Sequence, residues 1–188
     1  RGSGPGAADW RVGPHKTCMN SSVGKPIRVV IIDDETLFAK TLGAWLERDP
    51  GLSIEGYARS GNRGWELCRA TPPDLALVDV EMPDGDGITL AKRLLDQMPG
   101  IRVIIMTGRV DPHTAWRAGQ AGVQGLIDKT IEPEVLGKVI HLLVEGGRFL
   151  SPSFEKIREE WLTEPEAFQK VLTNRELAVL QRVTVGHS

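Results

Sequence analysis

The sequence has few cysteines, few aromatic residues and almost no net charge, and these shortages exclude several classes of protein. Only Cys18 and Cys68 are cysteines and they form no CxxC pair, which excludes a disulfide scaffold or a cysteine zinc site and is typical of a reducing cytoplasm. The formal charge of −2 gives no overall basic field for nucleic acid. No apolar run reaches the roughly 18 residues of a membrane span, and no charged start followed by an apolar segment suggests secretion. We therefore expect a cytoplasmic protein that does not contact membranes.

The remaining composition is that of an ordinary globular protein, with 40% hydrophobic and 26% charged residues in a chain of 188. At about 150 residues per domain, this length corresponds to one full domain and part of a second. Residues 1–24 are rich in glycine, serine and proline and show no periodicity. We expect them to form a disordered tail or a vector-derived remnant, with Met19 as a candidate natural start.

Five short apolar runs recur from Ile27 onward and predict the strands of a sheet. They begin at residues 27, 52, 74, 101 and 123, and their richness in valine and isoleucine favours strands buried on both faces. Helical stripes lie between them, such as Phe38, Leu42, Trp45 and Leu46. This alternation predicts an α/β fold over residues 25–147, a doubly wound (βα)5 parallel sheet with helices on both faces.

A different pattern begins after residue 147. We expect a turn-rich connector at 148–153 within a linker that extends to residue 171. Phe154, Ile157 and Trp161 share one face of a helix, which fits either a solvated linker helix docked by one stripe or a dimerisation helix. Farther on, Thr173 and Glu176 have the spacing of a capping box at the start of another helix.

Chemically active side chains stand where the predicted strands end. Asp33, Asp34 and Glu35 follow the first strand, Asp79 ends the third, Thr107 and Gly108 end the fourth, and Asp128 and Lys129 end the fifth. Ligands of open parallel sheets bind beyond the carboxyl ends of the strands, near the point where the strand order reverses. We therefore expect the three aspartates Asp33, Asp34 and Asp79, a hydroxyl and a lysine to meet at one edge of the sheet.

Such a cluster favours a hard cation and phosphate chemistry. Crowded carboxylates repel one another unless a cation lies between them, and an all-oxygen site without histidine or cysteine selects an ion such as Mg²⁺. Beside that ion, an aspartate can attack phosphorus and form an aspartyl phosphate. A lysine and a threonine hydroxyl would bind the phosphoryl oxygens. The residues therefore indicate phosphoryl transfer onto the protein.

At this point the sequence resembles the receiver domain of bacterial two-component response regulators, a flavodoxin-like fold. The matching segments, within residues 25–147, are IRVVIIDDETLF, DLALVDVEMPDGDGITLAKRL, IRVIIMTGR and AGVQGLIDK. The resemblance implies that Asp79 is the phosphoacceptor and that Mg²⁺ is bound by Asp33, Asp34, Asp79 and the backbone carbonyl of Glu81. It also implies that Thr107 and Gly108 form the switch and phosphate-binding segment and that Lys129 pairs with the phosphate. The phosphoryl donor would be a phosphohistidine on a sensor histidine kinase.

The C-terminal part resembles the regulators of the NarL/FixJ type. GGRFLSP is similar to their linker, and residues 172–188, LTNRELAVLQRVTVGHS, are similar to the opening of a LuxR-type helix-turn-helix domain. The turn and the recognition helix are not in this sequence, so we expect a truncated output domain and DNA binding only through the complete C-terminal domain. The implied function is that of a homodimeric transcriptional regulator. Its dimerisation and its DNA binding would change on phosphorylation.

Leu126 departs from the family pattern, which has tyrosine or phenylalanine three residues before the lysine. That aromatic side chain normally moves inward with the threonine, so the departure leaves open a pseudo-receiver that dimerises without phosphorylation.

A weaker alternative is a phosphatase of the haloacid dehalogenase type, whose DxDxT pattern is met only in part, because Glu35 stands where its second aspartate belongs. A dinucleotide site is excluded, since the first turn has acids instead of glycines. We expect a phosphoacceptor rather than an enzyme, apart from self-catalysed phosphorylation and dephosphorylation of Asp79.

Overall fold

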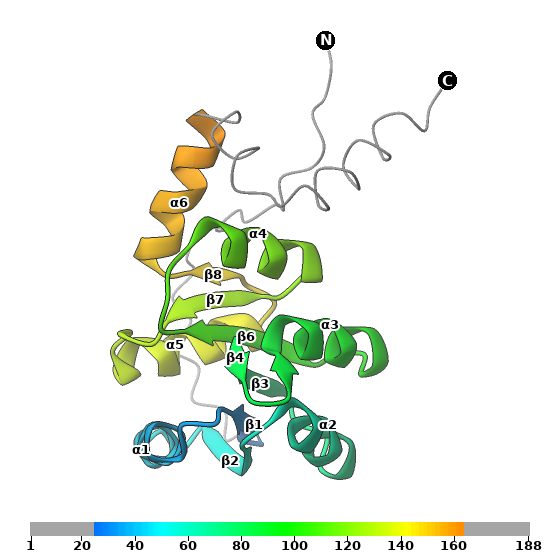
Figure 1. Cartoon of the computed structure of the whole chain (residues 1–188). Coiled ribbons are helices and arrows are strands. Elements are labelled where there is room, and N and C mark those ends of the chain that lie inside the picture. The colour runs from blue at the N-terminus through cyan, green and yellow to red at the C-terminus, as the bar shows by residue number, and fades with distance from the viewer. Residues whose placement is uncertain (1–24, 164–188) are drawn as a thin grey trace.

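A computed structural model describes residues 25–163, with side chains as far as residue 160, and shows a parallel sheet between two layers of helices (Figure 1). The strands are β1 Ile27–Ile32, β2 Leu52–Ala58, β3 Leu75–Asp79, β4 Glu81–Met82, β5 Gly85–Asp86, β6 Arg102–Thr107, β7 Gly125–Asp128 and β8 Phe149–Leu150. The helices are α1 Thr36–Leu46, α2 Gly61–Ala70, α3 Gly87–Gln97, α4 Pro112–Ala121, α5 Pro133–Val144 and α6 Pro152–Thr163.

The main sheet has the strand order β2-β1-β3-β6-β7-β8, and all its pairs are parallel. The chain builds outward from β1 to β2, returns to β3 on the other side of β1, and then continues through β6 and β7. The strand order therefore reverses between β1 and β3, which is where ligands of doubly wound sheets bind. The predicted doubly wound α/β fold is confirmed.

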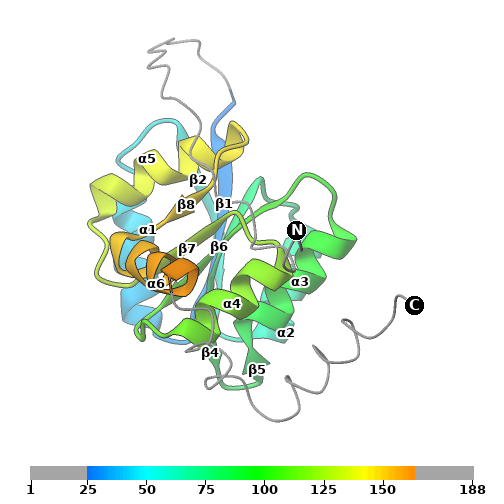
Figure 2. The same cartoon turned by 90° about the horizontal axis from the view of Figure 1, so that it is seen from above.

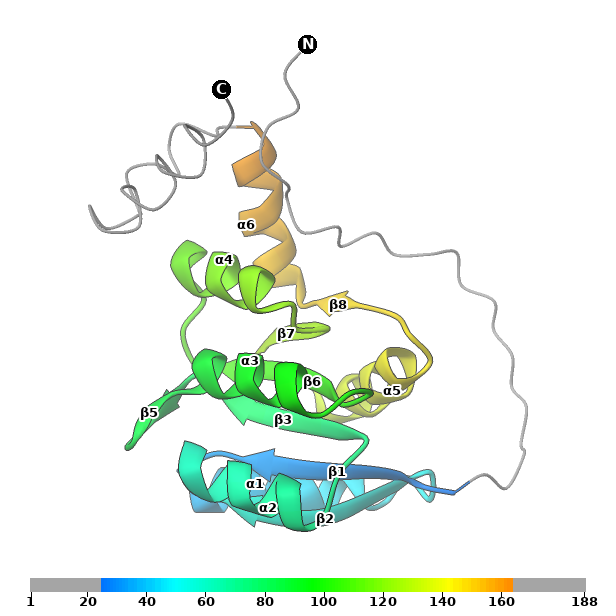
Figure 3. The ribbon, with the colours of Figure 1, turned by 90° about the vertical axis from the view of Figure 1, so that its right-hand side faces the viewer.

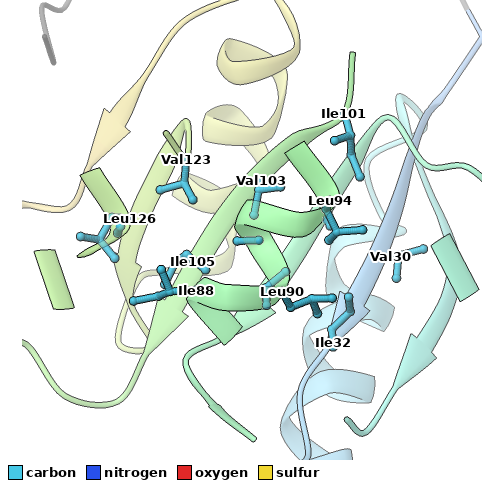
Figure 4. Packing of buried hydrophobic residues seen from close by; sticks show 14 of the residues in the cluster. Val30, Ile32, Ile88, Leu90, Leu94, Ile101, Val103, Ile105, Val123 and Leu126 are labelled. Atoms are coloured by element: carbon cyan, nitrogen blue, oxygen red, sulfur yellow. The ribbon is translucent and has the colours of Figure 1, made fainter. Parts of the chain in front are cut away.

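Alternation of side chains along the strands divides the core between the two faces of the sheet. Val29 and Ile31 of β1 pack on the side of α1 and α5, whereas Val30 and Ile32 pack on the side of α2 and α3. Figure 1 shows the two layers of helices on opposite sides of the sheet, Figure 3 shows the sheet from the side of α2 and α3, and Figure 4 shows part of the second cluster, with Val30 and Ile32 labelled. Burial on both faces explains why the central strands are almost continuously apolar.

Two strands differ from the sequence expectation. The connector expected at 148–153 contains β8, a two-residue strand that pairs with β7 and extends the sheet beyond residue 147. β2 was expected to be buried on both faces, but it lies at the edge of the sheet and most of its residues are only half-buried. An edge strand has a neighbour on one side only, which leaves more of its surface open to solvent.

The expected linker helix is present as α6, which packs beside α4 and the end of β7 (Figure 2). Phe154 is buried and Ile157 packs against the same cluster, so two members of the predicted stripe contact the receiver. The side chain of Trp161 lies outside the described part. The expected tail at 1–24 and the expected helix-turn-helix segment at 172–188, with Thr173 and Glu176, also lie outside the described residues. Within residues 25–163, no helix has the length and apolar character needed to cross a membrane.

Candidate functional site

Three aspartates meet at the carboxyl edge of the sheet, where the strand order reverses. Asp33 and Asp34 follow β1, Asp79 ends β3, and these two strands are adjacent, with Ile32 paired to Val78. One carboxylate oxygen from each aspartate lies within 4.8 Å of the other two. Asp33 and Asp79 are buried, whereas Asp34 is exposed. The fold thus brings together acids that are 45 residues apart in the sequence, as the strand-end pattern predicted.

Lys129 provides the positive charge inside this cluster. Its Nζ lies 2.9 Å from Oδ2 of Asp33, 3.1 Å from Oδ2 of Asp79 and 2.6 Å from Oε1 of Glu35. The lysine side chain is only 13% exposed, and its Nζ also lies 5.0 Å from the centre of the Phe38 ring. Burial opposes its charge, but the hydrogen bonds to Glu35 and Asp33 and the negative charge of Asp79 raise the pKa of Lys129 above its usual value. The lysine therefore stays protonated and partly neutralises the acids.

Asp79 is the most perturbed carboxylate of the cluster. It is 4% exposed, and this burial, together with the charge of Asp33, raises its pKa to about 6, although Lys129 and a hydrogen bond from the Glu81 backbone act in the opposite direction. A carboxylate that is costly to keep charged gains from any cation placed beside it. A cation bound beside Asp79 would therefore offset part of the cost of keeping this buried carboxylate charged.

A pocket of about 470 Å³ lies at two of these carboxylates, Asp34 and Asp79. Its lining consists of Asp34, Glu35, Asp79, Glu81, Met82, Pro83, Gly108, Arg109 and Lys129. Gly108 leaves space at the rim, because a Cβ there would meet no described atom within 4 Å. The pocket can therefore admit a phosphate-sized group next to Asp79 and Lys129.

Thr107 lies at the same edge but its hydroxyl is directed to a different partner. Its Oγ1 donates to the carbonyl of Arg109 at 3.0 Å and accepts from the Arg109 backbone N–H at 3.0 Å. Among the described residues Thr107 lines a second, neighbouring pocket of about 510 Å³, together with Glu81 and the start of α4, rather than the acidic pocket. The backbone still joins it to the site, since Lys129 N–H donates to the Thr107 carbonyl at 2.9 Å.

Leu126 is a core residue of β7. It is 0% exposed and belongs to the apolar cluster that contains Ala118 of α4 and Phe154 of α6. Figure 4 labels its side chain in this cluster, which also contains Ile88 and Ile105, and Ile105 is its partner on β6. The position at which the family pattern has an aromatic residue is thus occupied by a buried aliphatic side chain underneath α4 and α6.

Two acids near the site have contacts that the sequence did not predict. Glu35 binds Lys129, and Asp128 holds residues at the start of α6. Both stand next to predicted site residues, but their partners are 94 and at least 23 residues away in the sequence. The only available signal was their position at strand ends, which does not identify a partner.

The donor set fits a hard divalent cation such as Mg²⁺. Three carboxylates provide oxygen ligands at one point, Asp34 is exposed and offers an entry path, and the pocket leaves room for water and a phosphate oxygen. Asp33, Asp34 and Asp79 are the residues that could hold the ion.

A doubly wound α/β sheet with an acidic pocket and a half-buried lysine at its switch point defines a class of α/β domains that bind ligands at the carboxyl edge of the sheet. The family model of the response regulator receiver domain matches residues 29–141. The chain therefore belongs to the response regulator receiver family.

Three comparisons illustrate the relationship. The response regulator protein VraR of Staphylococcus saprophyticus is 26% identical over 164 residues, which cover 87% of this chain and 78% of VraR. A protein-glutamate methylesterase/protein-glutamine glutaminase of Oleidesulfovibrio alaskensis is 35% identical over 102 residues, 54% of this chain but only 27% of that protein. A two-component response regulator of the LuxR family from Aurantimonas sp. SI85-9A1 has a TM-score of 0.69 at 26% identity, over 73% of this chain and 99% of that one.

Proposed function

We propose that this chain is the phosphorylation-switched part of a two-component transcriptional regulator and that Asp79 accepts the phosphoryl group. The observation that supports this most directly is the placement of the Asp79 carboxylate. It lines an open pocket, close to Asp33 and Asp34, with Lys129 Nζ 3.1 Å from its Oδ2. A surface aspartate without such neighbours would have neither a cation site nor a fixed positive charge for an incoming phosphoryl group.

The donor in this proposal is a phosphohistidine of a sensor histidine kinase. A carboxylate oxygen of Asp79 attacks phosphorus, a P–O bond forms as the P–N bond breaks, and the imidazole nitrogen keeps the electron pair and takes a proton. Lys129 has three carboxylate partners before the reaction and would transfer its contact to a phosphoryl oxygen afterwards. The kinase supplies the chemical energy, and this chain supplies the acceptor and the positioning.

Mg²⁺ would be held by Asp33, Asp34 and Asp79, with the backbone carbonyl of Glu81 as a further ligand implied by the family pattern. When bound, the ion masks the negative charge of both the carboxylates and the phosphoryl group. Thr107 and Gly108 would bind phosphoryl oxygens. For Thr107 this requires its hydroxyl to leave the Arg109 backbone.

The output of the switch would be transcriptional. Residues 172–188 have the sequence pattern of a LuxR-type helix-turn-helix opening, and the Aurantimonas neighbour is a LuxR-family regulator. We propose that phosphorylation changes homodimerisation and, through the complete C-terminal domain, binding to DNA. The domain division that goes with this proposal is a receiver at 25–147, a linker at 148–171 and the beginning of the output domain at 172–188.

The decisive experiment is labelling with a small phosphodonor such as acetyl phosphate and Mg²⁺, read by intact-protein mass spectrometry. We expect one labile phosphoryl group on the parent chain and on Asp96→Asn, a control at an exposed carboxylate of α3, and none on Asp79→Asn. Equal labelling of Asp79→Asn and the parent would contradict the assignment.

The pseudo-receiver alternative rests on Leu126, and sedimentation separates it from the proposal. With Mg²⁺ and beryllofluoride, a phosphoryl mimic, we expect the dimer constant of the parent to change and that of Asp79→Asn to stay constant. Equal dimer constants of the parent with and without the mimic would favour dimerisation that does not depend on phosphorylation.

A further inference from the structure

Asp128 is a buried carboxylate that the proposed phosphoryl chemistry does not use. It ends β7, is 7% exposed, and is not among the described residues that line the acidic pocket. Its Oδ2 accepts hydrogen bonds from the hydroxyls of Ser151 at 2.8 Å and Ser153 at 3.0 Å. Its Oδ1 is bound by the backbone N–H and the hydroxyl of Thr130. A charged acceptor with four donors contributes more than a neutral hydrogen bond does.

The two serines belong to the start of α6. The Ser151 carbonyl accepts the N–H groups of Phe154 and Glu155 at 2.9 Å, so Ser151 stands at the N-cap position of the helix. The Ser151 N–H donates to the Leu126 carbonyl at 3.0 Å. The carboxylate of Asp128 therefore lies at the positive end of α6, which is the favourable place for an anion.

The other attachment of α6 is apolar. Phe154 is 1% exposed and lies in the cluster that contains Leu126. Beyond it, α6 extends away from the sheet (Figure 3), and the proposed output domain follows it in the sequence. The polar contact of α6 with Asp128 of β7 is thus combined with apolar packing of Phe154 in the cluster of Leu126 and with packing against α4.

Asp128 and Lys129 are successive residues, so the strand end that holds α6 also carries the lysine of the acidic pocket. We propose that Asp128 is a positioning residue that fastens α6 to β7, so that occupancy of the acidic pocket changes how firmly α6 is held. The inference rests on the proposed function, because a phosphoryl group on Asp79 would redirect Lys129 away from the carboxylates it now contacts. This coupling through Lys129 and Asp128 does not depend on the aromatic side chain of the family pattern, whose position is occupied by Leu126 in this chain.

The first test measures how firmly α6 is held to β7 in the absence of any ligand. Hydrogen exchange followed by mass spectrometry on the full 188-residue chain reports the opening of residues 152–163. We expect exchange there to be at least about fivefold faster in Asp128→Ala, since several hydrogen bonds are lost. The double variant Ser151→Ala/Ser153→Ala, which keeps the carboxylate and its Thr130 contacts, should show the same effect if Asp128→Ala does not fold. Thr130→Ala is the matched control, because it removes a partner of the same carboxylate without touching α6. Parent-like exchange in the double serine variant would overturn the inference.

The second test adds Mg²⁺ and beryllofluoride to the same samples. We expect protection of peptides covering 79–87 in every variant, and a change of exchange at 152–163 in the parent and Thr130→Ala that is absent in the double serine variant. Protection at 79–87 with no change at 152–163 in the parent would overturn the coupling and leave the proposed function intact. No protection at 79–87 would overturn the proposed function, and the coupling with it.

Discussion

The side chain of Asp86 shows how one residue can fix two helices around the site. Its Oδ2 accepts from the Thr89 backbone N–H at 2.8 Å, which makes it the N-cap of α3. Its two oxygens also bind the Arg117 guanidinium of α4 at 3.0 and 2.6 Å. Because the pair is bidentate and only about a third exposed, it has a defined geometry that most surface ion pairs lack.

We predict that the contribution of this pair to stability disappears in acid. Although burial acts in the opposite direction, the hydrogen bonds from Arg117 and Thr89 hold the pKa of Asp86 below its usual value. A depressed carboxylate pKa stabilises the fold above the unfolded pKa of about 4, and this contribution is lost as the pH falls through the folded pKa. Asp86→Asn keeps a capping side chain but loses the charge, and should lower the free energy of unfolding by about 1 kcal/mol at pH 7. In urea unfolding, the difference in this free energy between the parent and the variant should shrink below about pH 5. A difference that stays constant down to pH 3 would contradict the assignment.

Leu126 leads to a prediction about packing. Its side chain is completely buried against a cluster that already contains Ala118 and Phe154. Leu126→Tyr, which restores the aromatic residue of the family pattern, must displace these neighbours and should cost about 1 to 3 kcal/mol. Leu126→Met keeps the volume and should cost less than about 1.5 kcal/mol. Urea unfolding distinguishes the two, and a tyrosine variant as stable as the parent would show that the cluster has unfilled space there.

At the scale of elements, α3 begins in direct contact with the strand that ends in Asp79. A Cβ built on Gly87 would lie 1.8 Å from the Asp79 carbonyl oxygen, which is backbone and cannot move aside cheaply. Gly87→Ala should therefore destabilise the protein by at least about 2 kcal/mol and distort the acidic pocket. Gly137→Ala in α5 is the matched control, because a Cβ there would meet no described atom within 4 Å outside its chain neighbours and the backbone of its own helix. It should stabilise the helix by about 0.5 to 1 kcal/mol, as measured by thermal unfolding. Equal effects of the two substitutions would contradict the close approach.

The same scale explains what could be predicted from the sequence. The central strands were predictable because runs such as Ile27–Ile32 are long enough to show a β-branched, apolar composition, and the helices because they are long enough to show a helical period. The two residues of β8 are too few for any period, and they form a strand because the N–H groups of Phe149 and Ser151 donate to the carbonyls of Gln124 and Leu126, each at 3.0 Å. The β4 and β5 hairpin is equally short and was not predicted.

The acids and Lys129 of the site were predictable for a related reason. Parallel strands end at one edge, so residues at their ends must be neighbours. The direction of the Thr107 hydroxyl was not predictable, because it depends on a local hydrogen bond to Arg109. The partners of Glu35 and Asp128 were not predictable either, since they come from segments whose position only the whole fold determines.

At the scale of the whole molecule, the acidic pocket makes stability depend on divalent cations. A ligand that binds only the folded state stabilises it, by about 1.4 kcal/mol at ten times its dissociation constant. For a domain of this size, that gain raises the melting temperature by roughly 3 to 5 °C. We expect this shift with millimolar Mg²⁺ at constant ionic strength, measured by calorimetry.

Asp34→Asn is the variant that ties the shift to the pocket. Its side chain is exposed, so the substitution removes one oxygen ligand of the cluster with little effect on the fold itself. The variant should therefore melt close to the parent in the absence of Mg²⁺ and should lose most of the gain when the ion is added. Asp96→Asn, a surface carboxylate paired only with Lys92 among the ion pairs described, should keep the full gain. A parent that melts at the same temperature across the titration, or an Asp34→Asn variant that gains as much as the parent, would mean that the three aspartates do not bind the ion together.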